Sequence, residues 1–318
     1  MRIRRALVGT FPGEFVKRLL VRLRSSSNPG ARPAETTSPP AVRARGTQGQ
    51  NIALISHCDF GGNSAMHVYA IATELRRRGF RPAVIVPSNA RSVRDLGRPA
   101  FPVLTYRQAR NKGLGFESGQ GPDLVHAFTP REHVRRFTVA LAQSHDCPYV
   151  VHLEDNEAAI VGAQIDQART TAFLSRAVGI TAVVDRLLEL KPASVPAVVM
   201  WPGFDERILS PSRPREEVRK HLEVDPSTIV VAYTGNTHAS NLDDVGSLYA
   251  AISELREAGR SIVLVRTGWD FVPRSALPSL GPGIRALGWV ARDHIPEVLV
   301  SADILVQPGA PSAFNDYR

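Results

Sequence analysis

Short apolar runs of strand length alternate with helical patterns along the chain from residue 51 onward. Seven such runs lie before residue 210, at 52–56, 83–86, 102–105, 124–128, 149–153, 180–184 and 198–201. Four more follow, at 229–233, 262–266, 284–288 and 303–307. Because strands that alternate with helices build mostly parallel sheets, the pattern predicts an α/β protein. We expect two Rossmann-like halves with a cleft between them, the second half being incomplete.

Residues 51–87 show the pattern most clearly, as a strand, a glycine turn, a helix and a second strand. The helix presents one apolar face, formed by Val68, Ile71, Ala72 and Leu75. Asn63 or Ser64 is expected to cap its first turn, and Gly79 to end it. Residues 107–121 differ, because they are basic and contain glycines, which predicts a loop.

The turn at Gly61 and Gly62 is a candidate anion site. Unpaired backbone N–H groups at the start of a helix favour a phosphate. In the alternative interpretation, the glycines only let the chain reverse direction. A dinucleotide site is not indicated, since the turn lacks a G-x-G-x-x-G pattern and no acidic residue follows the second strand.

Composition and charge divide the chain into three parts. A length of 318 residues with 43% hydrophobic content suits two domains of ordinary size. We place a leader at 1–50, a first domain at 51–209 and a second at 210–318. Most of the net charge of +9 lies in residues 1–46, which hold ten Lys or Arg and two Glu. The remainder is nearly neutral, which argues against nucleic acid as a partner.

The leader combines basic residues with an apolar helical stripe at 15–23 and a Pro- and Ser-rich stretch. Its apolar positions are too few and too interleaved with charge for a membrane span or a cleavable signal. Residues 1–24 either contact an anionic membrane surface or form a solvated, disordered segment. Two cysteines, Cys58 and Cys147, indicate a reducing compartment. We predict a cytoplasmic protein, with peripheral contact at the inner membrane surface as the open alternative.

Polar residues gather where strands of the first half end, the edge at which open parallel sheets bind ligands. His152 ends the run 149–153, and His126 lies in the run 124–128. A neutral His152 could accept a hydroxyl proton, and a charged one could stabilise a leaving phosphate. In a third interpretation it belongs to a structural hydrogen-bond network. His67 and His126 are interpreted as either structural or acceptor-side.

The acids that follow His152 raise a separate question. Glu154, Asp155 and Glu157 are expected to hydrogen-bond acceptor hydroxyls or to orient His152. Asp155 and Glu157 could instead form a solvated helix N-terminus. A metal cluster with His152 is not favoured, because sequence-adjacent acids rarely converge on one ion. We predict no metal.

Three segments together resemble the GT-B glycosyltransferases of the family 4 type. They are Gly61 and Gly62 followed by His67 and Val68, the sequence PGFD at 202–205, and the stretch from LGWV to ADILVQP at 287–308. The resemblance covers residues 51–318. It implies transfer of a sugar from a nucleotide-sugar, bound mainly by the second domain, to a hydroxyl acceptor bound mainly by the first. It also implies no metal and no cofactor beyond the nucleotide-sugar co-substrate.

The resemblance assigns roles to individual residues. Gly62 matches the glycine whose backbone approaches the donor phosphates, and His152 the histidine near the reacting sugar. The chain departs from the family at 235–241, where many relatives carry an Arg and a Lys for the diphosphate. Here Gly235, Asn236 and His238, with Arg266 at the next strand end, are the candidate donor-binding residues.

The resemblance leaves several functions open. The acceptor would be a glycan, a lipid-linked molecule or a small molecule, in polysaccharide or cell-envelope glycan synthesis. The main alternative is a non-catalytic binding or scaffold protein of the same fold, or an inactive fragment, which the missing basic pair favours. An epimerase or phosphorylase of the GT-B type is a weaker alternative.

The second half has fewer strands than the resemblance implies. We therefore expect a C-terminally truncated enzyme that lacks measurable transferase activity and associates through uncovered apolar faces of the sheet. A naturally compact variant with a four-stranded sheet is the alternative.

Overall fold

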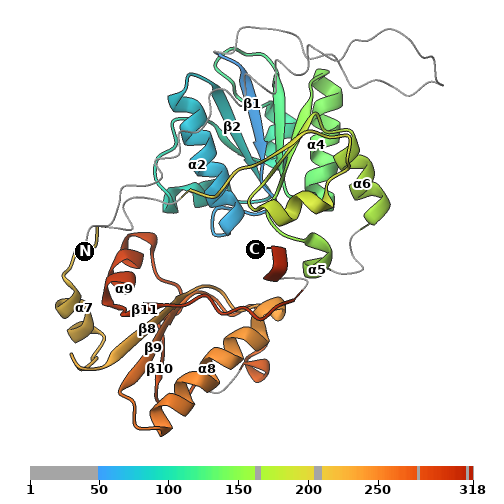
Figure 1. The fold of residues 1–318 in the computed structure, drawn as a ribbon. Coiled ribbons are helices and arrows are strands. Elements are labelled where there is room, and N and C mark those ends of the chain that lie inside the picture. Colours follow the sequence, from blue (N-terminus) through green and yellow to red (C-terminus); the bar gives the residue numbers. More distant parts are fainter. Residues whose placement is uncertain (1–48, 162–165, 204–209, 278–279, 313–314, 318) are drawn as a thin grey trace, which may run out of the picture.

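The computed structural model describes residues 49–161, 166–203, 210–277, 280–312 and 315–317 (Figure 1). The expected leader helix lies outside the described residues. Figure 1 shows two sheets in separate bodies, with α2 and α4 against the first sheet and α8 and α9 against the second. Within the described residues, no helix has both the length and the apolar character that crossing a membrane requires.

The first half contains a seven-stranded parallel sheet in the order β3-β2-β1-β4-β5-β6-β7. All seven predicted strands are confirmed. The strands are β1 (Asn51–Ile55), β2 (Arg81–Val86), β3 (Val103–Thr105), β4 (Leu124–Phe128), β5 (Tyr149–Leu153), β6 (Gly179–Ala182) and β7 (Ala197–Val199). The order reverses between β1 and β4, and such a reversal opens a crevice at the carboxyl ends of the strands.

Helices connect these strands. They are α2 (Asn63–Arg77), α3 (Tyr106–Lys112), α4 (Glu132–His145), α5 (Glu157–Val161) and α6 (Gln167–Ser175), with 3₁₀ turns η1 (Ala90–Asp95) and η3 (Asp185–Leu190). The prediction of a loop from 107 was wrong for its first turns, which form α3. The reason is a capping box, in which the side chains of Thr105 and Gln108 each bind the other's backbone N–H.

The second half contains a four-stranded parallel sheet in the order β10-β9-β8-β11. The strands are β8 (Ile229–Thr234), β9 (Ile262–Thr267), β10 (Ile284–Ala286) and β11 (Ile304–Leu305), and all four predictions are confirmed. The helices are α7 (Arg215–His221), α8 (Leu242–Glu257) and α9 (Ile295–Ser301), with 3₁₀ turns η5 (Ala239–Asn241), η6 (Arg274–Ala276), η7 (Arg292–His294) and η8 (Asn315–Tyr317).

Both sheets are buried on both faces, as parallel sheets require. Successive residues of β1 alternate between two core clusters, with Ala53 and Ile55 in one and Ile52 and Leu54 in the other. The second sheet also packs between two clusters. Its edge strand β11 is less covered, since Ile304 and Leu305 are 50% and 62% exposed.

Two contacts join residues of the two halves. Nη1 of Arg292, in η7, lies 3.5 Å from Sδ of Met66 on α2. The guanidinium of Arg186 lies over the ring of Tyr317, 5.6 Å from its centroid. The first of these contacts brings the start of α2 close to the loop that follows β10.

Candidate functional site

The turn between β1 and α2 brings the backbone of Gly62 close to the side chain of Cys58. Gly62 is the N-cap of α2, and a Cβ at this position would lie 2.5 Å from Sγ of Cys58. Gly61 has open space around its Cα. The expectation that Asn63 or Ser64 caps the helix was wrong, because α2 begins at Asn63 and no side chain caps it. The side chain of Ser64 binds elsewhere.

Ser64 and His67 hold the carboxylate of Glu154 from one face of α2. Oγ of Ser64 donates a hydrogen bond to Oε2 of Glu154, and Nδ1 of His67 lies 3.1 Å from Oε1. Glu154 is buried, whereas the His67 side chain is 32% exposed. Since Ser64 lies in the first turn of α2, the carboxylate occupies the positive end of the helix dipole. An anion of the protein itself thus binds beside the glycine turn.

His152 lies at the end of β5 and is 1% exposed. Its Nδ1 lies 2.6 Å from Oγ1 of Thr181 on β6, and its Nε2 lies 3.9 Å from Oε1 of Glu154. Burial, followed by the nearby imidazoles of His126 and His67, holds the pKa of His152 well below its ordinary value. The imidazole is therefore neutral near pH 7, and the lowered pKa also makes it a weaker base than a free imidazole.

His126 contacts the same Thr181 hydroxyl as His152. Its Nε2 lies 3.3 Å from Oγ1 of Thr181, and its ring meets that of His152 edge to face with centroids 5.9 Å apart. Burial lowers the pKa of His126 to about 4. The structure thus places His126 in a network of two neutral imidazoles around one threonine.

Glu157 begins α5 and is 3% exposed. The prediction of a solvated helix N-terminus is wrong for this residue, because the segment packs inward. Its Oε2 accepts a hydrogen bond of 2.8 Å from Nε of Arg131. Burial raises the pKa of Glu157, while Arg131 opposes that shift. Asp155 is partly exposed between Glu154 and this ion pair.

Three of these side chains could hold a metal ion. Nδ1 or Nε2 of His67 and His152 and a carboxylate oxygen of Glu154 all lie within 4.8 Å of one another. Two imidazoles and a carboxylate form a donor set that suits zinc. The short distance of 3.1 Å between His67 and Glu154 is that of a hydrogen bond, so the cluster also holds together through its own contacts.

The candidate donor residues lie in loops at the carboxyl edge of the second sheet. The side-chain Oδ1 of Asn236 accepts a hydrogen bond from the backbone N–H of Trp269, and the N–H of His238 binds Oδ1 of Asn241. At Gly268 the backbone φ is +102°, and a Cβ there would lie 2.4 Å from the carbonyl oxygen of Gly235. The loops after β8 and β9 therefore pack directly on each other.

Arg266 lies within β9, one residue before the strand ends, and is 2% exposed. Its Nη1 donates a hydrogen bond of 2.8 Å to the hydroxyl of Tyr249, and its Nη2 lies 2.8 Å from Oδ1 of Asp270. The guanidinium thus already has a carboxylate partner. This reduces the positive charge that Arg266 would present to a diphosphate.

The same edge of the second sheet also exposes two aromatic rings. Trp269 and Trp289 follow β9 and β10, are 54% and 48% exposed, and lie nearly parallel with ring centroids 6.3 Å apart. Sequence reasoning missed this pair. Their positions just after Gly268 and Gly288, each at a strand end, were the available signal.

The structure brings together some of the predicted site residues and separates others. His126, His152 and Glu154 form one network at the edge of the first sheet, together with Thr181, Ser64 and His67. Gly235, Asn236, His238 and Arg266 lie at the edge of the second sheet. Ser64 was missed as a partner, although its spacing of three residues from His67 on one helix was a usable signal.

The fold resembles several solved structures. HepE from Anabaena in complex with UDP-glucose has a TM-score of 0.62 and 16% identity, over 80% of this chain and 72% of that one. A glycosyltransferase from Rickettsia africae has a TM-score of 0.53 and 14% identity, over 81% and 72%. A putative UDP-N-acetylglucosamine 2-epimerase from Listeria monocytogenes has a TM-score of 0.54 and 8% identity, over 81% of this chain and 73% of that one.

No protein-family model and no curated protein sequence matches the chain. The similarity to solved structures is similarity of fold. The chain has the GT-B fold that its sequence predicted, with two Rossmann-like sheets.

Proposed function

We propose that this protein transfers a sugar from a nucleotide-sugar donor to a hydroxyl acceptor. The observation that carries the proposal is the network of His152, Glu154 and His67 at the switch point of a GT-B fold. Two structures with this fold support it, since HepE is described with UDP-glucose and with UDP.

The residues suggest a division of roles. In this proposal His152 accepts the proton of the acceptor hydroxyl, and the carboxylate of Glu154 stabilises the imidazolium that forms. Glu154 lies 3.9 Å from that imidazole and orients the more exposed His67 through a hydrogen bond. The loop that begins at Gly235 would hold the donor through the side chains of Asn236 and His238, because no fixed positive charge lies at 235–241 and the N–H groups of Thr237, His238 and Gly268 are already bonded within the protein.

Several finer features belong to the same proposal. The chain would be of the family 4 type and would use neither a metal nor a cofactor besides the nucleotide-sugar. Its acceptor would be a glycan, a lipid-linked molecule or a small molecule of polysaccharide or cell-envelope synthesis. We place the protein in the cytoplasm, and residues 1–24 keep two alternatives, a solvated segment without a partner or a contact with an anionic membrane.

A second function is a non-catalytic protein of the same fold. One observation favours it, namely that Arg266 is paired with Asp270 and so offers little charge to a diphosphate. Both functions predict that the protein binds the nucleotide-sugar. Only the transferase would turn it over.

A thermal-shift screen of UDP-, GDP- and ADP-sugars tests the proposal. A ligand that binds the native state raises the unfolding temperature by mass action, so at least one nucleotide-sugar should do so. Release of the nucleoside diphosphate from that donor then separates a transferase from a non-catalytic protein. If no nucleotide-sugar shifts the unfolding temperature, the proposal fails.

A further inference from the structure

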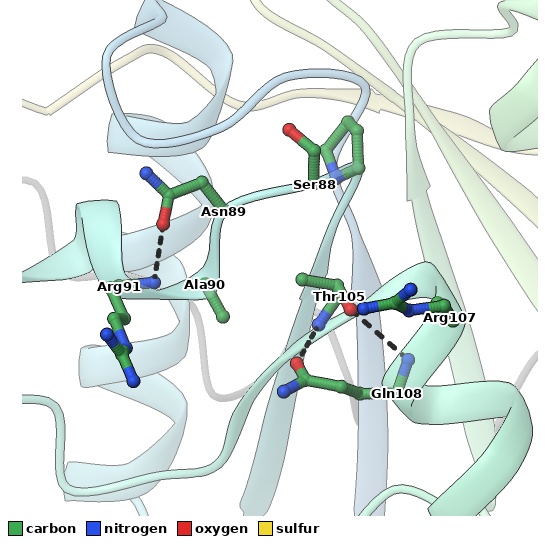
Figure 2. A pocket seen from close by; sticks show the side chains of 8 residues that line it. Ser88, Asn89, Ala90, Arg91, Thr105, Arg107 and Gln108 are labelled. Atoms are coloured by element: carbon green, nitrogen blue, oxygen red, sulfur yellow. Dashed lines mark hydrogen bonds between the residues drawn. The ribbon is translucent and has the colours of Figure 1, made fainter.

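A pocket lies at the carboxyl edge of the first sheet, and none of its lining residues belongs to the network around His152. It has a volume of about 430 Å³, within the roughly 300–1,000 Å³ typical of ligand pockets. It lies between the 87–91 segment that follows β2 and the β3–α3 turn (Figure 2). Because β2, β3 and β5 are parallel strands of one sheet, the pocket opens on the same edge as His152.

The charge of this pocket has one sign. Arg91 and Arg107 line it from its two sides, and its other lining residues are uncharged. Both side chains are exposed, and among the described residues neither guanidinium has a carboxylate partner. This distinguishes them from Arg76, Arg77 and Arg78 at the end of α2, which all pair with acids.

The surrounding segment is basic as a whole. Residues 87–112 contain six Arg or Lys and one Asp, whereas residues 47–318 as a whole contain 29 Arg or Lys and 28 Asp or Glu. Concentration of one sign around a concave surface raises the local density of oppositely charged ligands.

The walls of the pocket are held in place by internal hydrogen bonds. The carboxylate of Asp59 accepts bonds from the N–H and hydroxyl of Ser88 and from the N–H of Asn89. On the opposite side, Thr105 and Gln108 bind each other's backbone. The hydroxyls of Ser88 and Thr105 are thus engaged in holding the walls, whereas the two arginines are exposed and available to a ligand group.

We propose that Arg91 and Arg107 bind a phosphate ester carried by the acceptor. A guanidinium presents a planar fork of N–H donors that matches phosphate oxygens, and two such side chains line this pocket. The donor diphosphate is assigned to the other sheet, so this pocket is left for the acceptor. The acceptor role rests on the proposed function, whereas phosphate binding itself does not.

The test compares two double variants of the full chain. Arg91→Gln/Arg107→Gln removes both pocket arginines, and Arg94→Gln/Arg98→Gln removes two exposed arginines of the same segment that do not line the pocket. Both change the net charge equally, so a general electrostatic effect acts on both alike. Arg91→Lys/Arg107→Lys keeps the charge and removes the fork. Equal unfolding temperatures without ligand show that each variant is folded.

Binding is measured at constant ionic strength with two probes, glucose 6-phosphate and phosphatidylcholine vesicles with and without phosphatidic acid. We expect the pocket variant to lose at least about tenfold in affinity for one of these phosphate esters, and the control to stay within about twofold. The lysine variant should be intermediate. Response to the sugar phosphate identifies a soluble ester, and response to the vesicles alone identifies a lipid ester.

Two results would overturn the proposal. One is an equal loss in the pocket variant and in the control, and the other is no loss in either. UDP-glucose binding is measured on the same proteins. If UDP-glucose fails to bind but the phosphate response depends on Arg91 and Arg107, the proposed function fails while the phosphate site stands.

Discussion

Nδ1 of His67 lies 3.1 Å from Oε1 of Glu154, although 87 positions separate the two residues. The contact joins α2, which follows β1, to the end of β5. With the hydrogen bond from Ser64 to the same carboxylate, it ties together both sides of the switch point. The carboxylate is therefore part of the fold as well as of the candidate site.

Ser64→Ala should lower the free energy of unfolding by about 1–3 kcal/mol. The change leaves one oxygen of the buried Glu154 carboxylate without its donor. Thr73→Ala on the same helix is the control, since the Thr73 hydroxyl binds only the carbonyl of Tyr69 and is exposed. It should cost less than about 0.5 kcal/mol. Urea unfolding at pH 7 measures both, and equal costs would contradict this account of Glu154.

Stability should fall as the pH is lowered below about 6.5. Burial lowers the pKa of His126 to about 4 and also lowers that of His152, so the unfolded chain binds more protons than the folded one between these values. The stabilisation is present above the unfolded pKa and is lost toward the folded pKa.

His126→Gln should make this pH dependence shallower. One proton corresponds to a slope of about 1.4 kcal/mol per pH unit, and the variant removes up to that amount between pH 6.5 and 4. Urea unfolding at a series of pH values measures the slope. An unchanged slope would show that His126 is not held neutral by the fold.

Gly268→Ala should destabilise the second half more than Gly259→Ala. Both glycines have positive φ, +102° and +79°, and so both substitutions carry backbone strain of about 1–2 kcal/mol. Only at Gly268 does the new Cβ meet backbone, at 2.4 Å from the oxygen of Gly235. We expect a total cost above about 3 kcal/mol there. Thermal unfolding of both variants measures the two losses of stability. Equal losses would contradict the close packing of the loops after β8 and β9.

The sequence predicted the strands better than the connections. A strand of a parallel sheet is buried on both faces and therefore appears in the sequence as a short apolar run. All eleven such runs form strands. The start of α3 was missed because its signal is one Thr–Gln capping box in a basic segment. Local chemistry outweighed composition there.

The candidate site was predicted in part. The positions of His152 and Glu154 follow from a strand end, which sequence shows directly. Their partners do not, because Ser64, His67 and Thr181 come from other elements, and only the packing of α2 and β6 determines which side chains meet. The pairing of Arg266 with Asp270 and Tyr249 was equally hidden, since it depends on the loop after β9 and on α8.

His152→Ala should lower sugar transfer by about a hundredfold or more in the active enzyme. The substitution removes the imidazole that we propose as the proton acceptor, and donor binding at the second sheet should persist. His221→Ala, an exposed position on α7, is the matched control and should keep full activity. Steady-state rates of nucleotide release measure the effect. Turnover close to that of the wild type in His152→Ala would remove this residue from the mechanism.

Removal of metal ions should leave transfer unchanged. His67 and Glu154 already interact at a hydrogen-bond distance of 3.1 Å, so the cluster is organised by its own contacts. Rates with and without EDTA, followed by addition of Zn²⁺ or Mn²⁺, measure this. Activity that EDTA abolishes and one of these ions restores would instead assign His67, His152 and Glu154 as metal ligands.

Calorimetric titration of the full chain with the nucleotide-sugar selected by the thermal screen tests the central claim most directly. The account predicts one saturable site per chain, and binding that the Arg91→Gln/Arg107→Gln variant retains because the donor lies at the other sheet. Absence of saturable binding for every UDP-, GDP- and ADP-sugar would contradict the assignment of this fold and its histidine network to sugar transfer.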